Sequence, residues 1–303
     1  MITGTVVSLA ADPTFVSTAL VFGLSVVTVV IAGISRVWGG RDRAGDDDAG
    51  AGAGESGVNS ASATPLRCQG VAVWPYRPLD LIGAAWVAGI YMWLALAQVA
   101  ALATMDADPQ RGIRLADLWV SIFFQGFMAC TVMIVMWPRI APGAWLGLRP
   151  GSWPRVILLA PLSVGLMWMF FALLQLAGYV EWVESLGAET VQESVQVLRS
   201  GDNLPLIGLM AFAAVVVAPV CEEIVFRGYL YGVAKRYCGA FAGALATSLA
   251  FAAAHASLVA LLPLAMFGLL LTWLYERTGT IWAPIAAHAC FNAATVAIQL
   301  AIR

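Results

Sequence analysis

The stretch AFAAVVVAPVCEEIVFRGYL, residues 211–230, places three charged side chains directly after a long apolar run. That run begins near residue 204, and a helix of about 20 residues covers the roughly 30 Å hydrocarbon layer of a bilayer. Holding a charged side chain at the centre of such a helix costs about 2.5–3.5 kcal/mol. Residues 204–226 are therefore predicted to be a membrane-spanning helix whose charged residues have a function that offsets this cost.

Apolar runs of similar length recur along the 303-residue chain, which is 61% hydrophobic and only 11% charged. A soluble domain has about 25% charged residues, so this composition suits lipid better than water. The runs are continuous rather than alternating, which favours helices over a barrel because every backbone polar group must be satisfied inside lipid. We predict an all-α, polytopic bundle of about eight transmembrane helices. They lie near residues 15–37, 80–105, 115–138, 156–180, 204–226, 239–256, 259–276 and 281–302.

Composition divides the chain into four segments. Residues 1–38 hold the first transmembrane helix, which we expect to be retained because its start lacks the basic residues of a signal peptide. Residues 39–64 are mostly Gly, Ala, Ser and Asp and are predicted to form a disordered linker. Residues 65–200 hold the second to fourth helices and a polar, acidic stretch whose spaced Val and Leu residues suit a short interfacial helix. Residues 201–303 hold the remaining helices, of which the fifth is expected to continue to about Arg236 and the seventh is short.

Basic residues are distributed unequally between the two sides of the predicted bundle. With the N-terminus outside, most of the 16 Lys and Arg residues fall in the inner loops and helix ends, as the positive-inside rule requires. Arg111, Arg114, Arg199 and Arg303 fall outside. We expect an integral membrane protein, and the Ala- and Gly-rich composition favours the inner (cytoplasmic) membrane of a bacterium. The lipid bilayer is its expected environment, and the net charge of −2 gives no indication of nucleic-acid binding.

Glu222, Glu223 and Arg227 form the first of three polar motifs. Residues 223 and 227 are i and i+4 on a helix, with the acid before the base, so Arg227 can neutralise Glu223. Glu222 points about 100° away and is left without a local partner. A carboxylate in such a place suits proton transfer near neutral pH. A glutamate pair alone would equally fit a charged cluster at a helix end that does no chemistry.

Both histidines of the chain lie in the two remaining motifs. Phe251-x-x-x-His255 lies in the sixth apolar run, and His288-x-x-x-Asn292 lies in the eighth. Taken singly, each of these polar residues could be a structural histidine or a hydrogen-bonding link between membrane helices. Glu222 and His255 are 33 positions apart (222 to 255), and a polar, turn-like segment lies near their midpoint. Two antiparallel helices joined there would bring both residues to about the same height, which allows a direct contact.

The three motifs, in this order on successive helices, resemble the CPBP family of intramembrane peptidases. That family includes CAAX prenyl endopeptidases of the Rce type and Abi-like bacterial proteins of bacteriocin processing or immunity. The resemblance covers roughly residues 204–302, and it extends to Arg-Gly-Tyr-Leu after the glutamates and Thr-Gly-Thr-Ile-Trp-Ala-Pro-Ile before His288. Residues 1–150 show no such match. The resemblance implies that residues 201–303 are the catalytic core of an intramembrane endopeptidase.

The resemblance also implies roles for the matching residues. Glu222 would be the general base that activates a water molecule, and His255 would help to hold and polarise that water. Glu223, tied to Arg227, would support the position of Glu222. Phe251 would be a supporting residue of the same site.

His288 and Asn292 are implied to donate hydrogen bonds to the oxyanion of the tetrahedral intermediate, at about 3 kcal/mol per donor. A metal-assisted form stays open, because Glu222, His255 and His288 could hold a zinc ion with one open position. No HExxH motif is present, so the cofactor is either none or a divalent metal. The expected substrate is a peptide or a membrane protein, since prenylated CAAX proteins are eukaryotic and this composition is bacterial.

Two other functions fit parts of the pattern. Buried Glu, His and Arg residues also serve as proton relays in membrane transporters. Against this reading, the chain shows no internal repeat of the kind that many transporters contain. A non-catalytic immunity or scaffold protein of the same family is the second alternative, and the presence of every motif residue argues against it.

The helix lengths raise a question about depth. His255 lies about 24 Å along its helix from the turn at residues 238–239, whereas His288 lies about 14 Å from the turn at residues 277–280. The two rings can meet only if the fifth and sixth helices project beyond the bilayer, or if the seventh is tilted or broken. Pro263 would permit such a break.

Overall fold

The computed structural model describes residues 12–44, 70–104, 113–187, 197–198 and 203–302, and the elements in these ranges are helices. Seven helical segments of this described part are long and apolar enough to cross a membrane. They are Pro13–Arg36, Pro78–Ala101, Leu115–Met136, Trp153–Leu176, Leu204–Cys238, Leu258–Thr278 and Trp282–Ala301. The prediction of an all-α, polytopic bundle is confirmed, and the chain is an integral membrane protein.

The described helices include two wider, π-helical sections, which both lie in one continuous helical stretch. In chain order they are α2 (Pro13–Ala44), α3 (Pro78–Thr104), α4 (Leu115–Met136), α5 (Pro142–Trp145), α6 (Trp153–Leu176), α7 (Tyr179–Ser185), α9 (Leu204–Phe212), the π-helix η2 (Ala213–Val217), α10 (Ala218–Glu223), the π-helix η3 (Ile224–Leu230), α11 (Tyr231–Cys238), α12 (Ala240–Ala253), α13 (Leu258–Thr278) and α14 (Trp282–Ala301). Because α9, η2, α10, η3 and α11 are continuous, we call Leu204–Cys238 the long helix.

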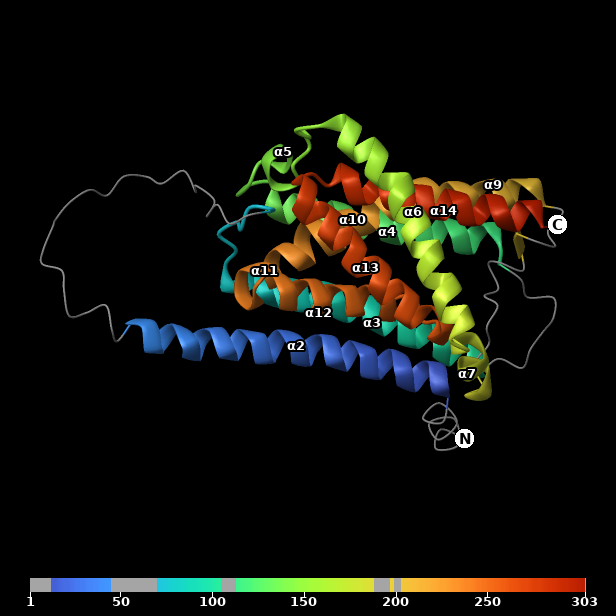
Figure 1. Ribbon diagram of the computed structural model, residues 1–303, viewed down its shortest axis with the longest axis horizontal. Helices are drawn as coiled ribbons and strands as arrows, with labels where there is room; N and C mark the ends of the chain where they lie inside the picture. Colours follow the sequence, from blue (N-terminus) through green and yellow to red (C-terminus); the bar gives the residue numbers. More distant parts are fainter. Residues whose placement is uncertain (1–11, 45–69, 105–112, 188–196, 199–202, 303) are drawn as a thin grey trace, which may run out of the picture.

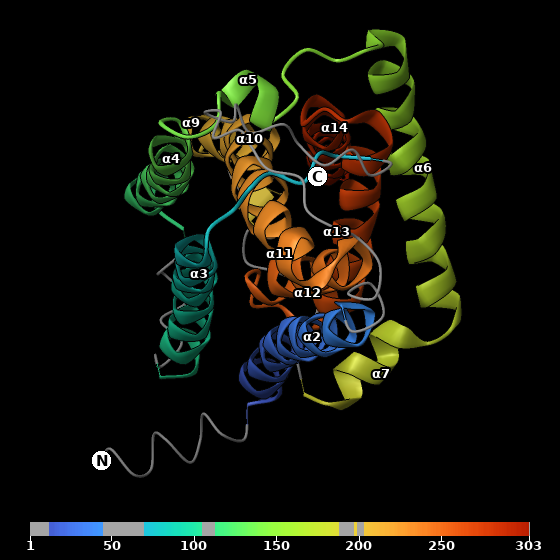
Figure 2. The same ribbon diagram turned by 90° about the vertical axis from the view of Figure 1, so that its left-hand side faces the viewer.

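The long helix passes through the middle of the bundle. Its 35 residues rise about 50 Å, more than the roughly 30 Å hydrocarbon layer, so it must tilt or project beyond the layer. The prediction that the fifth helix continues to about Arg236 is therefore confirmed. In Figure 2, α10 and α11 lie centrally, with α3 and α4 on one side and α13 and α14 on the other.

α12 is shorter than predicted, and α13 is longer. α12 has 14 residues and rises about 21 Å, so the predicted full crossing at 239–256 is wrong. The chain turns after Ala253, where Ala256 has a left-handed φ of 49°, a backbone state that costs a non-glycine residue about 1–3 kcal/mol. α13 has 21 residues and runs obliquely between α12 and α14, with Pro263 inside it (Figure 1). Apolar composition alone does not reveal where a helix stops.

Two further boundaries can be compared with the prediction. α2 continues to Ala44, so residues 39–44 of the predicted linker are helical, and its remainder, 45–64, lies outside the described residues. α7 forms a short helix at the start of the acidic stretch, where an interfacial helix was expected. Most of the remaining stretch, 188–196 and 199–202, also lies outside the described residues.

α12 and α13 approach each other closely at Gly268, as membrane helices do where small residues meet. A Cβ atom on Gly268 would lie 2.9 Å from the Cβ atom of Ser248, which is closer than packing allows. We expect Gly268→Ala to lower the free energy of unfolding by about 1–3 kcal/mol, as overpacking does. Gly165→Ala in α6, where a Cβ would meet nothing within 4 Å, is the matched control. Equal unfolding midpoints for the two variants in detergent would contradict the close contact.

Candidate functional site

The glutamate pair lies between the two π-helical sections of the long helix. π-Helical turns are rare and occur frequently at functional sites. In η2 the amide of Ala218 donates to the carbonyl of Ala213, five residues earlier, and the next donor in that register would be Pro219, which has no N–H. The carbonyl of Ala214 therefore lacks a donor within the helix. The Nδ2 atom of Asn292 donates to it at 2.7 Å, which attaches α14 to the helix just before the glutamates.

Glu223 is fully buried and joins two elements that are distant in sequence. Its Oε1 atom accepts a hydrogen bond from Nη1 of Arg227 at 2.8 Å, so the pairing predicted from their i, i+4 spacing is present. The same oxygen lies 2.9 Å from Nδ1 of His288 in α14. A carboxylate that holds an imidazole nitrogen orients the ring and selects the nitrogen that carries the proton.

Arg227 is 2% exposed, and its surroundings compensate its charge on several sides. Besides the bond to Glu223, its Nη2 atom donates to the carbonyl of Gly268 in α13 at 3.2 Å. Its guanidinium carbon lies 4.5 Å from the ring centroid of Phe251 in α12, a distance at which a cation is attracted by the ring face. Arg227 therefore ties the long helix to α12 and α13 at one point.

Phe251 lies between the two histidines. The centroids of its ring and the His255 ring are 4.8 Å apart, and those of its ring and the His288 ring are 5.9 Å apart. Phe267 of α13 packs against His288 from another side, at 5.4 Å. Both imidazoles thus lie at one depth, because α12 is short and α13 runs obliquely. The two rings therefore meet without a break of α13 at Pro263.

Glu222 lies within electrostatic reach of Glu223, Arg227 and His288. Its Oε2 atom and that of Glu223 are buried and have no hydrogen-bond partner among the residues that the structure describes. We call these two atoms the open oxygens. They lie on adjacent residues at the end of α10, beside a cluster whose other charged atoms are paired.

The direct contact between Glu222 and His255 that their spacing allows is not formed. His255 lies in the turn beyond the end of α12, and its Nδ1 atom is 2.8 Å from the carbonyl oxygen of Phe251. Within the described ranges, no hydrogen bond or ion pair joins His255 to a glutamate; the imidazole that contacts one is His288. The spacing argument assumed that α12 continues past residue 255, whereas the turn directs the ring back onto its own helix.

The predicted zinc ligands do not form a three-ligand set in this arrangement. In the part of the chain that the structure describes, no group of three or more His, Cys, Asp or Glu side chains could hold a metal ion. Nδ1 of His288 contacts Glu223, and Nδ1 of His255 contacts a backbone carbonyl. The chemistry that these residues can perform as they stand is proton transfer and hydrogen bonding.

α3 contributes a residue that the sequence motifs missed. The hydroxyl of Tyr91 is buried, has no hydrogen-bond partner in the described part of the chain, and interacts electrostatically with Glu222. We call it the open hydroxyl. No motif in the sequence marks Tyr91; the helical period shows only that it shares a face of α3 with Asp80, eleven positions or about three turns earlier.

One protein-family model matches the part of the chain that contains the long helix, α12, α13 and most of α14. A family model described as type II CAAX prenyl endopeptidase Rce1-like matches residues 204–294. YdiL of Bacillus subtilis (strain 168), described as a candidate membrane peptidase, is 31% identical over 190 residues, which cover 60% of this chain and 72% of YdiL. An uncharacterized 24.3 kDa protein of Escherichia coli is 35% identical over 96 residues, which cover 30% of this chain and 44% of that protein. No solved structure matches significantly.

Proposed function

The chain belongs to the CPBP family of intramembrane peptidases, and we propose that it hydrolyses a peptide bond with a water molecule activated by Glu222. Family membership makes the chain a membrane peptidase in the broad sense. The observation that carries the finer proposal is the open oxygen of Glu222 beside the paired cluster of Glu223, Arg227 and His288. A buried polar atom without a partner is costly, which favours a role in binding a reactant.

In the proposed step, Glu222 accepts a proton from the water as the water oxygen attacks the carbonyl carbon of the scissile peptide. The electron pair of the C=O bond moves to the carbonyl oxygen and gives a tetrahedral oxyanion. When this intermediate collapses, the C–N bond breaks and the proton held by Glu222 passes to the leaving nitrogen. The products are a carboxylic acid and an amine, and every atom of the water is accounted for.

The two histidines support this step in different ways. If Nδ1–H of His255 donates to the Phe251 carbonyl, the neutral ring presents the Nε2 lone pair, which can accept a hydrogen bond from the water. If Nδ1–H of His288 donates to Glu223, its Nε2 atom can donate to an oxyanion only after the ring is protonated. Asn292 uses one of its two N–H groups on Ala214, and the second would serve the oxyanion.

The metal-assisted form is a separate proposal, in which the side chains of Glu222, His255 and His288 would have to rearrange from their described contacts to hold one zinc ion. A zinc ion there would supply Lewis-acid chemistry at the scissile carbonyl or the water. The metal content of the purified protein and its activity after chelation decide between the two forms. Full activity without bound metal would remove the metal-assisted one.

We propose that the substrate is a peptide or a membrane protein, because the site lies between helices that cross the membrane. Mass spectrometry of peptides and membrane proteins from cells with the wild type and with Glu222→Ala tests this. We expect one or more uncleaved proteins to accumulate in the variant cells. An identical pattern, with both proteins present in the membrane at equal amounts, would weigh heavily against a peptidase.

A further inference from the structure

The ring of Tyr91 reaches from α3 into the layer of aromatic side chains around the charged cluster. Its centroid lies 5.2 Å from that of Phe226 in η3 and 5.5 Å from that of Phe124 in α4, both as edge contacts. Phe226 in turn makes an edge contact with Phe251, which touches both histidines. Phe226 follows Glu222 by four positions on the long helix, so the open hydroxyl comes from outside the motif helices and its ring packs on the side of the long helix that carries Glu222.

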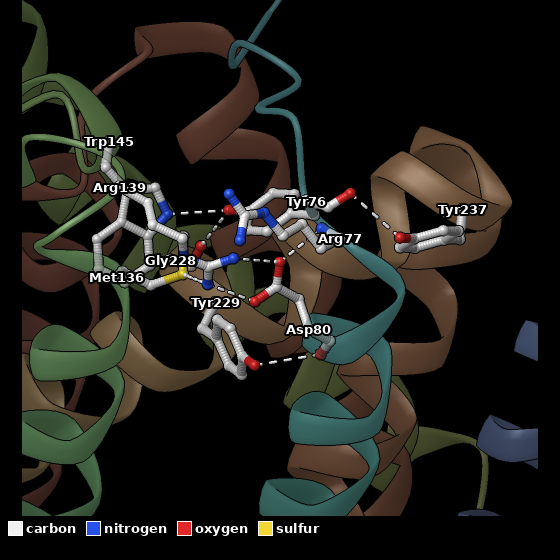
Figure 3. A network of polar contacts seen from close by, with 9 residues as sticks. All are labelled: Tyr76, Arg77, Asp80, Met136, Arg139, Trp145, Gly228, Tyr229 and Tyr237. Carbon is white, nitrogen blue, oxygen red and sulfur yellow. Dashed lines mark hydrogen bonds and ion pairs between the residues drawn. The ribbon is translucent and has the colours of Figure 1, made fainter. Parts of the chain in front are cut away.

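The beginning of α3 is fixed against the long helix by the polar contacts drawn in Figure 3. The backbone carbonyl of Asp80, three turns before Tyr91 on the same face of α3, accepts a hydrogen bond from the Tyr229 hydroxyl at 3.1 Å. Its carboxylate is ion-paired with Arg139, which follows α4, and the Nη1–Oδ2 distance is 2.8 Å. These bonds hold α3, η3 and the end of α4 in one register, which directs Tyr91 toward the long helix.

A second contact reaches the π-helical section itself. The Tyr76 hydroxyl, just before α3, accepts a hydrogen bond from Nε1 of Trp145 at 2.9 Å and donates to the carbonyl of Gly228 at 3.4 Å (Figure 3). Burial raises the pKa of the Tyr76 phenol, so it remains a donor. Gly228 follows Arg227 directly, so the start of α3 is attached within one residue of the charged cluster.

The donors of the motif helices are largely committed. Arg227 donates to Glu223 and to Gly268, and one N–H of Asn292 donates to Ala214. Nδ1 of His288 faces Glu223. Hydrolysis requires donors at the oxygen where negative charge develops. The open hydroxyl is a donor that is held in place and is not engaged by any described residue.

We propose that the Tyr91 hydroxyl is a further catalytic donor, which binds the oxygen of the scissile carbonyl as it becomes the oxyanion. The inference rests on the proposed function. The proton stays on Tyr91, and no bond of the tyrosine is made or broken. The donor would come from α3, outside the range 204–294 that the family model matches.

Tyr91→Phe tests the proposal, because it removes the hydroxyl and keeps the ring. We expect kcat to fall by about 10²–10³-fold, as for the loss of one oxyanion donor, with KM changed by less than about threefold. The unfolding temperature should stay unchanged or rise slightly, since the variant breaks no hydrogen bond within the described chain. The substrate for this assay is a segment of a protein that accumulates uncleaved in Glu222→Ala cells. The segment is prepared as a quenched fluorescent peptide.

Tyr229→Phe is the matched control in the same interface, since it removes a hydrogen bond that is in place. It should lower the unfolding temperature and reduce kcat far less than Tyr91→Phe. A wild-type kcat for Tyr91→Phe beside an inactive Glu222→Gln would overturn the role of Tyr91 and leave the proposed function standing. An equal loss in both tyrosine variants, or a loss that parallels the unfolding temperature, would also overturn it. Absence of cleavage by the wild type would overturn both proposals.

Discussion

Replacing Glu222 with glutamine is expected to lower the rate of peptide cleavage by about 10²–10⁴-fold, the usual contribution of a general base. The amide has nearly the same shape as the carboxylate but cannot take up the proton of the water. The fold should remain intact, because the open oxygen of Glu222 makes no hydrogen bond to the described residues and a neutral group is easier to bury. Cleavage of the same quenched peptide by both purified proteins gives the rates, and thermal unfolding in detergent checks the fold.

Glu276→Gln is a suitable control for this experiment. Glu276, in α13, accepts hydrogen bonds from the Tyr231 hydroxyl and from Nζ of Lys235, both at 2.6 Å. These partners lie in α11, beyond the end of η3. The control should therefore lose stability while each folded molecule keeps its cleavage rate. Wild-type cleavage by Glu222→Gln would contradict a glutamate base.

The fold class follows from the sequence because membrane helices are decided by local composition. In a continuous apolar run, the helix satisfies every backbone N–H and C=O group within the segment itself, as lipid requires. What composition does not determine is where a helix ends. α12 stops at Ala253 because the chain turns there through Ala256, which has a left-handed backbone conformation. The residue types in this stretch do not predict that conformation. Because of this turn, His255 hydrogen-bonds to the carbonyl of Phe251 on its own helix, and the contact with Glu222 that the spacing allows is not among the hydrogen bonds of the described residues.

Part of the site could be predicted from the sequence. The predictable contacts are those between residues that are close together in the chain. The Glu223–Arg227 pair is local, so the helical period alone predicts it. The contact of Glu223 with His288 joins positions 65 apart and depends on how α14 packs against the long helix. Tyr91 required the packing of α3 as well, which no motif records. The roles of His255, His288 and Asn292 in catalysis stay predictions.

Replacing Glu223 with alanine is expected to lower the free energy of unfolding by about 3–5 kcal/mol, the effect of leaving a buried charge without its partner. Arg227 is 2% exposed, and Glu223 is the carboxylate that pairs with it. The same change frees Nδ1 of His288, so the ring loses the contact that orients it. Equilibrium unfolding of purified wild type and variant in mixed micelles measures the difference. A loss below about 1 kcal/mol would mean that water reaches Arg227 and replaces the carboxylate.

The double variant Glu223→Leu with Arg227→Met separates stability from catalysis. Removing both members of the pair leaves neither Glu223 nor Arg227 as an uncompensated charge, so most of the lost stability should return, as replacement of a buried ion pair by apolar residues often allows. Cleavage should not return, because Glu222 would then lie beside an unoriented His288 without the neighbouring charges. A double variant as unstable as Glu223→Ala would show that side-chain packing, rather than charge compensation, determines the stability of the bundle at this position. A stable double variant that cleaves at the wild-type rate would show that Glu222 works without the pair.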